Sequence, residues 1–150
     1  MALVKILARH LLVELNTGTD AVPVYTKVGG LETLEFAAEK TDVDDTDFDS
    51  DGEAEHKVVQ RARKITLDGF YLEDPTTGDR DPGQEALIAL GDAIGYDSTK
   101  GLRMTTPGGN TTTYKVSAKV DGPGGGGKNA NSSFKAELTV SGAPVYTPAV

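Results

Sequence analysis

Residues 134–141, Phe134-Lys135-Ala136-Glu137-Leu138-Thr139-Val140-Ser141, alternate apolar and polar side chains along their whole length. Residues 113–120 repeat this alternation. Successive side chains of a β-strand point to opposite faces, so the pattern predicts strands with one buried and one solvated face. Between a third apolar stretch, 102–106, and residues 111–120 stands Pro107-Gly108-Gly109-Asn110, which is typical of a hairpin turn. These segments predict an antiparallel sheet.

Four further segments have strand character and bring the predicted number of strands to about seven. They are residues 11–15, 22–28, 31–36 and 65–72. A chain of 150 residues is long enough to bury a core of its own, so we expect a single domain over residues 1–150. The sequence therefore predicts a mainly β fold, a β-sandwich or half-barrel.

One α-helix is predicted at about residues 82–94, flanking the sheet. Asp81 is a suitable N-cap, Pro82 suits the first helical position, and Gln84 has the spacing of a capping box. Gly95 is a suitable stop. The predicted apolar face consists of Leu87, Leu90 and Ile94.

The net charge of the protein lies in one segment. Residues 39–55 contain nine acidic residues and one base, Lys40, and so carry the whole formal charge of -8. The other 14 acids and 14 bases cancel. Because the segment has no apolar period, we expect a long acidic loop at about residues 40–56. An acidic chain repels nucleic acid rather than binding it by charge.

The sequence contains no pattern that points to an enzyme or a cofactor. It has no cysteine, and its two histidines, His10 and His56, have no partner at metal-ligand spacing. Residues 122–129 approach a phosphate-binding loop, but Asn129 replaces the required hydroxyl and a strand pattern follows instead of a helix. No secretory signal and no membrane-spanning run are predicted. We therefore expect a non-enzymatic protein without cofactor or metal.

A calcium site is the alternative explanation of the acidic segment. Residues 47–52, Asp47-Phe48-Asp49-Ser50-Asp51-Gly52, match the first half of an EF-hand loop. The twelfth position is Val58, which has no carboxylate to offer the ion. A calcium-dependent β-sandwich module, of the binding or adhesin kind, is thus the alternative function.

A basic stretch follows the acidic segment, and in an extended strand Lys57, Arg61 and Arg63 would share a face. Two interpretations stay open: an ordinary solvated edge, or a partner for the acidic segment in the same chain or in a neighbour. On the second interpretation we expect contacts between subunits from Asp42, Asp44, Asp45, Asp47, Asp49, Asp51, Glu53, Glu55, Lys57, Arg61 and Arg63.

The order of these features resembles that of the major tail tube proteins of bacteriophages with long, non-contractile (siphovirus-type) tails. The resemblance covers roughly residues 11–144. It rests on Val28-Gly29-Gly30-Leu31-Glu32-Thr33-Leu34, the strand at 64–69, the helix start at 81–87, the hairpin at 102–109, and the exit at 138–144. Related injection machines such as gene-transfer particles use similar tubes.

The resemblance implies a structural subunit of a virion tail, assembled in the host cytoplasm. Six subunits would form a ring, rings would stack into a tube, and inner strands would close into one continuous barrel. The acidic loop would reach a neighbouring ring. Implied partners are further copies of the chain, the tape measure protein, the tail terminator, and distal tail or baseplate proteins. DNA would pass through the lumen without specific binding, and no membrane is involved. No additional C-terminal immunoglobulin-like domain is expected.

Overall fold

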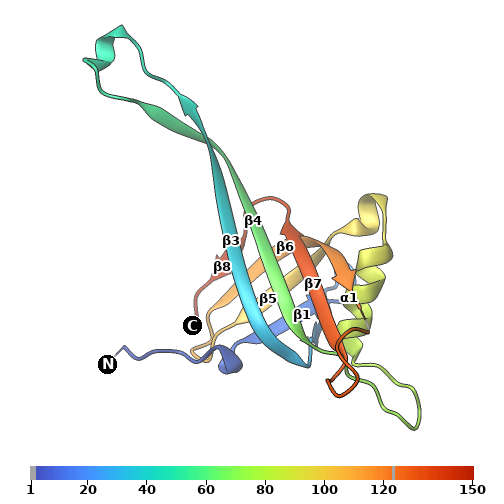
Figure 1. The fold of residues 1–150 in the computed structure, drawn as a ribbon. Helices are drawn as coiled ribbons and strands as arrows, with labels where there is room; N and C mark the ends of the chain where they lie inside the picture. Colours follow the sequence, from blue (N-terminus) through green and yellow to red (C-terminus); the bar gives the residue numbers. More distant parts are fainter. Residues whose placement is uncertain (1–2, 123) are drawn as a thin grey trace.

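The computed structural model describes residues 3–122 and 124–150, and in them the strands form one antiparallel sheet (Figure 1). The strands are β1 (Leu12–Asn16), β2 (Tyr25–Lys27), β3 (Leu31–Asp44), β4 (His56–Phe70), β5 (Lys100–Thr105), β6 (Thr111–Asp121), β7 (Ser133–Val140) and β8 (Val145–Thr147). The helical elements are α1 (Pro82–Asp92) and the short 3-10 turns η1 (Ala8–His10), η2 (Phe48–Ser50) and η3 (Gly95–Ser98). The mainly β fold with one flanking helix is confirmed.

The sheet has the order β2-β1-β5-β6-β7-β4-β3, with β8 paired to the first part of β6. It curls, so that β1, β5 and β6 pass behind β3, β4 and β7 (Figure 1). The rings of Phe36 on β3 and Tyr114 on β6 lie 6.3 Å apart, although these strands are not neighbours in the sheet. The architecture is therefore the half-barrel of the prediction and not a sandwich of two sheets.

The core fills the concave side of this half-barrel. Alternate residues of β4 and β7, such as Ile65, Leu67 and Leu138, are fully buried, while Lys64 and Glu137 occupy the other face. The core consists of Val13, Leu15, Val28, Ile65, Leu67, Leu87, Leu90, Leu102, Met104, Val116, Phe134, Ala136 and Leu138. The alternation of residues 113–120 and 134–141 thus reports the burial of one sheet face.

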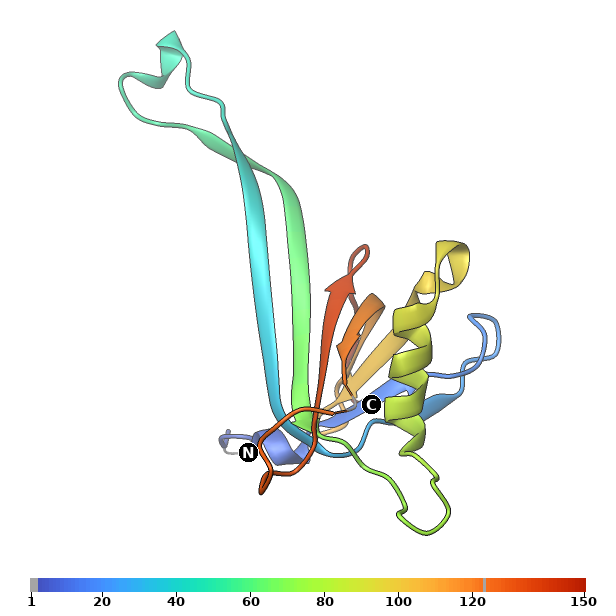
Figure 2. The same cartoon turned by 45° about the vertical axis from the view of Figure 1, so that its right-hand side comes forward.

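Helix α1 closes one side of the half-barrel (Figure 2). Leu87 and Leu90 are buried beneath it, and burying two such side chains stabilises the docked helix by about 3–6 kcal/mol. The helix ends at Asp92, two residues earlier than predicted, because Ala93 is extended. Ile94 is 88% exposed, so its prediction as part of the buried face was wrong.

The first turn of α1 is fixed to two distant segments of the chain. Asp81 caps the helix, and its carboxylate accepts from the backbone N–H groups of Gln84 (3.1 Å) and Gly29 (3.0 Å). Gln84 is fully buried and bonds to backbone groups of Gly29, Phe70 and Leu72. The predicted cap is confirmed, but the side chain of Gln84 joins the helix to the sheet instead of completing a capping box.

The largest difference from the sequence prediction lies in the segment expected to be a long loop. β3 continues to Asp44 and β4 already begins at His56, so the loop is confined to residues 45–55. Only the part of β4 from Arg63 onward pairs with β7. The remainder of the β3–β4 hairpin projects away from the domain (Figures 1 and 2).

Smaller corrections concern two strands. The strand predicted at residues 22–28 is reduced to β2, because Pro23 has no N–H and the side chain of Asn16 holds Gly18 and Val24 in a loop. Strand β8 was not predicted at all. Its three residues are exposed and have no apolar alternation.

Two more sequence predictions concern the glycine-rich stretch 122–129 and membrane-spanning segments. The glycine-rich stretch 122–129 includes Pro123, which lies outside the described residues, and its described part leads toward β7 instead of a helix. Within the described residues, no helix has the length and apolar character needed to span a bilayer.

Candidate assembly surfaces

The tip of the β3–β4 hairpin is a hydrogen-bonded turn. The backbone N–H of Asp45 donates to the carbonyl of Glu55 at 2.8 Å, and the N–H of Glu55 donates to the hydroxyl of Thr46 at 2.9 Å. These bonds close the loop across its base, so that residues 45–55 have a defined shape.

Turn η2 at the tip has a reciprocal cap. The Asp47 carboxylate accepts from the N–H of Asp49 (3.0 Å) and the hydroxyl of Ser50 (3.2 Å). Asp51 and Gly52 follow in left-handed backbone conformations, with φ of 51° and 80°, which turn the chain back toward β4. Phe48 stands between the capping residues with its side chain completely exposed, at 105%. The turn thus holds an apolar ring out into solvent.

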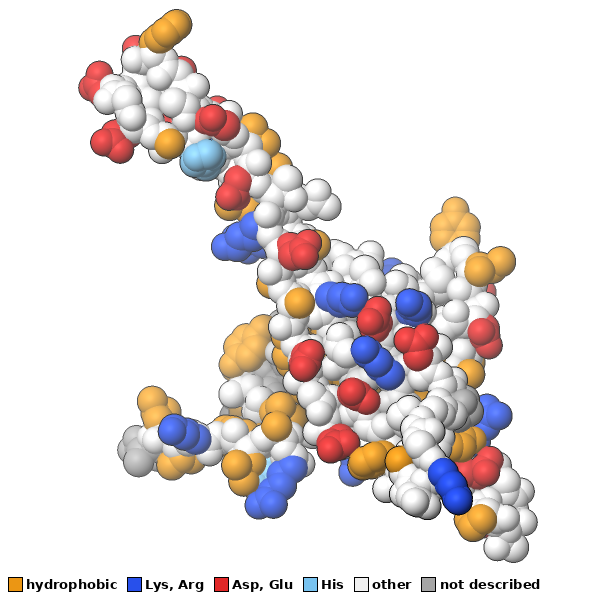
Figure 3. Space-filling view, viewed as in Figure 1, with side chains coloured by type: hydrophobic (Ala, Val, Ile, Leu, Met, Phe, Trp, Pro, Cys, Tyr) orange, Lys and Arg blue, Asp and Glu red, His pale blue; other side chains and the backbone are white. Residues whose placement is uncertain are grey.

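The acidic residues predicted as contacts are spread over the outer half of the hairpin (Figure 3). Asp42 and Asp44 lie in β3, and Asp45, Asp47, Asp49, Asp51, Glu53 and Glu55 form the tip. Hydrogen bonds from the side chain and the backbone N–H of Thr46 lower the pKa of Asp44. Its carboxylate therefore stays charged at neutral pH and below.

The geometry gives no support to a calcium site at the tip. In residues 3–122 and 124–150, no group of three or more His, Cys, Asp or Glu side chains is placed to hold a metal ion. The Asp47 carboxylate instead accepts the capping hydrogen bonds of η2.

The basic residues of β4 do not share one face, contrary to the prediction. Arg61 pairs with Lys40, and Val58 pairs with Asp42, so the register shifts by one residue at Val59. Such a bulge moves the following residues to the opposite face, which places Lys57 away from Arg61 and Arg63. Lys57 forms an ion pair with Asp45 of the same chain at 2.9 Å. The acidic and basic segments thus meet at this pair within one hairpin.

The convex face of the sheet carries charges of both signs, which alternate over β4 and β7 (Figure 3). Lys64 lies 3.3 Å from the carboxylate of Glu137, and Lys135 lies 4.0 Å from it. The hydrogen bond from Lys64 and its charge lower the pKa of Glu137. This face is balanced in charge, in contrast to the hairpin tip.

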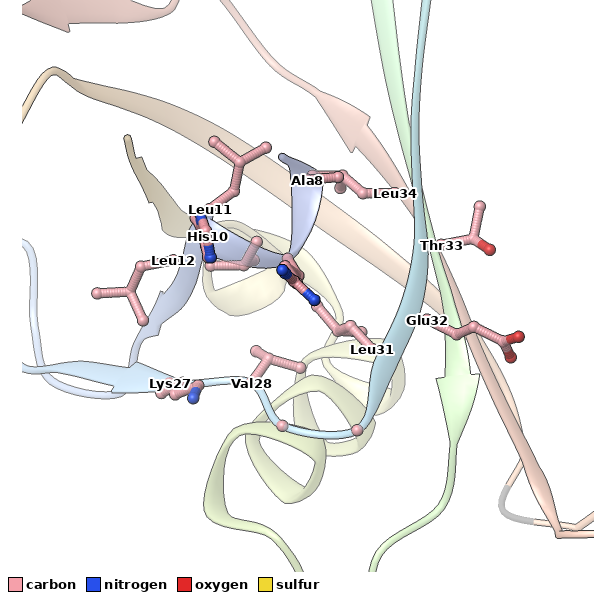
Figure 4. A pocket seen from close by; sticks show the side chains of 14 residues that line it. Ala8, His10, Leu11, Leu12, Lys27, Val28, Leu31, Glu32, Thr33 and Leu34 are labelled. Atoms are coloured by element: carbon pink, nitrogen blue, oxygen red, sulfur yellow. The ribbon is translucent and has the colours of Figure 1, made fainter. Parts of the chain in front are cut away.

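A pocket of about 460 Å³ lies at the base of the hairpin, between η1 with the start of β1 and the segment that joins β2 to β3. Val13 and Val28 are buried in its wall, and Leu31 and Leu34 point toward η1 (Figure 4). Glu32 and Thr33 project from the other side of β3 (Figure 4). The pocket therefore has both apolar and polar groups in its wall and is open to solvent.

The outer edge of β3 is a further candidate surface. In the described part of the chain, no strand pairs with this edge, although β3 is 14 residues long. A long unpaired edge exposes backbone N–H and C=O groups that can pair with another chain.

That the acidic residues make contacts between subunits stays a prediction, and neither Phe48 nor the pocket was predicted as a separate feature. An aromatic residue inside an otherwise charged segment was the available signal for Phe48. The pocket had no such signal, because it combines segments from two separate parts of the chain.

Comparison by sequence finds no relative: no protein-family model matches the chain, and neither does any curated protein. Comparison by structure finds solved tails and tubes. A chain in the tail of an empty gene transfer agent particle, reconstructed with C6 symmetry, superposes with a TM-score of 0.69 at 17% identity. The match covers 95% of this chain and 99% of that chain.

Two further structures come from injection systems. The cap of the anti-feeding prophage, a tube-terminating cap, gives a TM-score of 0.59 at 15% identity and covers 99% of this chain and 95% of that chain. The sheath-tube complex of an extracellular contractile injection system gives 0.55 at 14% identity, with 97% and 93% covered. The fold is thus one found in tails and tubes, and it is not specific to non-contractile tails.

Proposed function

We propose that this chain is a structural subunit of the tail tube of a phage or a related particle. The carrying observation is the likeness in fold, over almost the whole of both chains, to a component of a tail with C6 symmetry. Six copies form a ring, rings stack into a tube, and the tube is the conduit through which the genome is delivered. The protein belongs to the particle tail and acts without catalysis.

The open edge of β3 supports the ring. Proteins normally protect a strand of 14 residues from edge-to-edge pairing, yet here the described strands leave its outer edge free. In a ring, each curled sheet joins its neighbours through such edges, and the joined sheets close into a barrel that has no free edge.

The projecting hairpin supports the stacking of rings. Its outer part projects away from the rest of the described chain, so packing within the subunit gives no reason for its length (Figure 2). A hairpin that reaches an adjacent ring gains its contacts only in the assembled tube. Its negative charge keeps free subunits apart through mutual repulsion until they assemble.

The charge distribution suits a conduit for DNA. The chain has a net charge of -8, and outside residues 39–55 its acidic and basic residues balance. Without an excess of basic residues, the tube wall makes few phosphate contacts and DNA slides instead of adhering. As a tail tube subunit, the chain would also have as partners a tape measure protein in the lumen, a terminator, and distal tail or baseplate proteins.

Electron microscopy of the purified protein over a range of concentrations and salt tests this proposal. We expect rings with sixfold symmetry that stack into tubes. If the protein stays monomeric under all conditions, including mixtures with its cognate tail proteins, the proposal is wrong.

A further inference from the structure

We propose that Phe48 of one copy inserts into the pocket at the base of the hairpin of another copy, and that this contact links successive rings. The inference rests on the proposed function, because it needs an assembly of many copies. It specifies the acceptor site of the hairpin tip.

Phe48 is exposed on a capped turn at the tip of the hairpin. Its ring is wholly exposed, which is unfavourable for an aromatic side chain unless a partner covers it. The cap at Asp47 and the left-handed residues after Ser50 fix the turn around it. Little conformational entropy is therefore lost when the ring enters a partner.

The pocket at the base of the hairpin has a size and a lining that suit an aromatic ring. Its volume of about 460 Å³ accommodates a phenyl ring with its flanking turn, and falls in the range of pockets that bury small groups. Val28 and Leu31 provide apolar side chains in its wall, beside polar groups (Figure 4). An aromatic anchor in such a pocket is the usual centre of a protein interface.

The charges around the pocket and the charges around the hairpin tip are opposite in sign. Arg9, His10 and Lys27 lie in the wall of the pocket and are exposed, and Glu32, the single acid of its lining, points away from the cavity (Figure 4). The tip around Phe48 carries acids throughout residues 45–55. A basic rim around an apolar pocket therefore matches an acidic rim around an apolar ring.

Phe48 and the pocket of the same copy are too far apart to meet, so the two partners belong to different copies. Leu31 at the pocket and Asp44 near the tip are the two ends of β3, which at about 3.3 Å per residue is roughly 45 Å long. The tip and the start of β3, which lines the pocket, also lie at opposite ends of the hairpin (Figure 1). The contact joins unlike surfaces of two copies, and such a contact can repeat from copy to copy along an open stack.

Cross-linking tests the contact directly, because the natural chain has no cysteine. Phe48→Cys and Leu31→Cys in separate copies should form a disulfide-linked dimer on oxidation. The matched control pairs Phe48→Cys with Thr139→Cys, an exposed residue of the convex face. If tubes form but the control pair cross-links as well as the pocket pair, this inference is overturned while the proposed function stands. Some other partner would then fill the pocket.

Charge exchange provides the second test. Asp49→Lys and Lys27→Glu should each weaken assembly when present alone. A mixture of the two variants should assemble again, because each tip then finds a pocket of opposite charge. Phe48→Ala should raise the concentration needed for tube formation on the order of tenfold, as removal of an interface anchor does. Glu85→Lys, an exposed change on α1, is the control. Unaltered assembly of Phe48→Ala would contradict the inference.

The tube itself gives a third readout. The pocket-to-tip distance within a copy also separates the pockets of linked copies. Leu31 and Phe48 are 17 residues apart, so at about 3.3 Å per residue the axial repeat cannot exceed roughly 56 Å. A longer repeat in electron micrographs would overturn the inference. A complete failure of the natural protein to associate would overturn both the inference and the proposed function.

Discussion

The side-chain amide of Gln84 donates to the carbonyl of Gly29 at 2.9 Å, across 55 positions of the sequence. The same nitrogen donates to the carbonyl of Phe70 at 2.8 Å, and the side-chain oxygen accepts from the N–H of Leu72. One buried side chain therefore satisfies three backbone groups and fixes the helix to the segment where β3 begins.

Gln84→Ala should lower the free energy of unfolding by about 3 kcal/mol, because it leaves buried backbone groups without partners. Urea denaturation monitored by circular dichroism measures this loss. Gln60→Ala, on the exposed hairpin, is the control and should change stability by less than about 0.5 kcal/mol. Equal effects of the two substitutions would show that the buried network is unimportant.

Gly83→Ala should destabilise the protein by more than about 2 kcal/mol, since a backbone shift is needed to fit the methyl group. An added Cβ would collide with the backbone of Lys27 and Val28. In Gly91→Ala of the same helix, the nearest atom to the new methyl group is a side-chain atom of Val120 at 3.3 Å, and the gain in helix propensity offsets that contact. Thermal unfolding of both variants distinguishes close helix–sheet packing from a general effect of glycine replacement.

Replacing residues 42–59 with Asn-Gly should leave a folded domain that cannot form tubes. Thr41 and Gln60 are paired in the hairpin, and a two-residue turn of this sequence joins antiparallel strands well. Circular dichroism should retain the β spectrum and the unfolding midpoint, while sedimentation shows monomers or single rings. Loss of the folded domain would show that the tip stabilises the core.

Lys64→Met should raise the pKa of Glu137 toward its usual value of 4.5, because the hydrogen bond and charge of Lys64 lower it. Carbonyl NMR titration measures the change. A carboxyl group with a lowered pKa in the folded state stabilises the protein above pH 4.5 and loses this contribution as the pH falls through the lowered pKa. The stability difference between the natural protein and the variant should therefore shrink below pH 4.5.

Lys119→Met is the control for this titration, because Lys119 acts on Glu137 only through its charge and more weakly. If Lys119→Met raised the pKa of Glu137 as much as Lys64→Met does, the lowered pKa would come from the combined charges on the sheet and not from the Lys64 hydrogen bond.

The sequence predicted the sheet and helix wherever one face of an element is buried. Residues 113–120 and 134–141 alternate because β6 and β7 have core and solvent faces, and Leu87 and Leu90 report the buried side of α1. Gln84 was predicted to cap its own helix. Its contacts with Gly29 and Phe70 depend on tertiary proximity, which residue spacing does not reveal.

The outer hairpin was predicted as a loop because both of its faces are exposed. A strand without a buried face needs no alternation, and the many acids of residues 39–55 resemble a solvated loop. The bulge at Val59 has no signature in the residues themselves, so the faces assigned to Lys57 and Arg61 could not be predicted. The candidate contact residues were identified from charge, and their arrangement came only from the structure.

The separation of Phe48 from the pocket gives a stack of rings a direction. In the proposed tube of six-membered rings, one end would present unused acidic tips and the other would present empty pockets with basic rims. Whichever end grows, a protein that caps the end with free tips must itself offer a pocket. A protein that caps the other end must offer a surface that resembles a tip. The two capping proteins of such a tube would therefore differ in surface charge and could not replace one another.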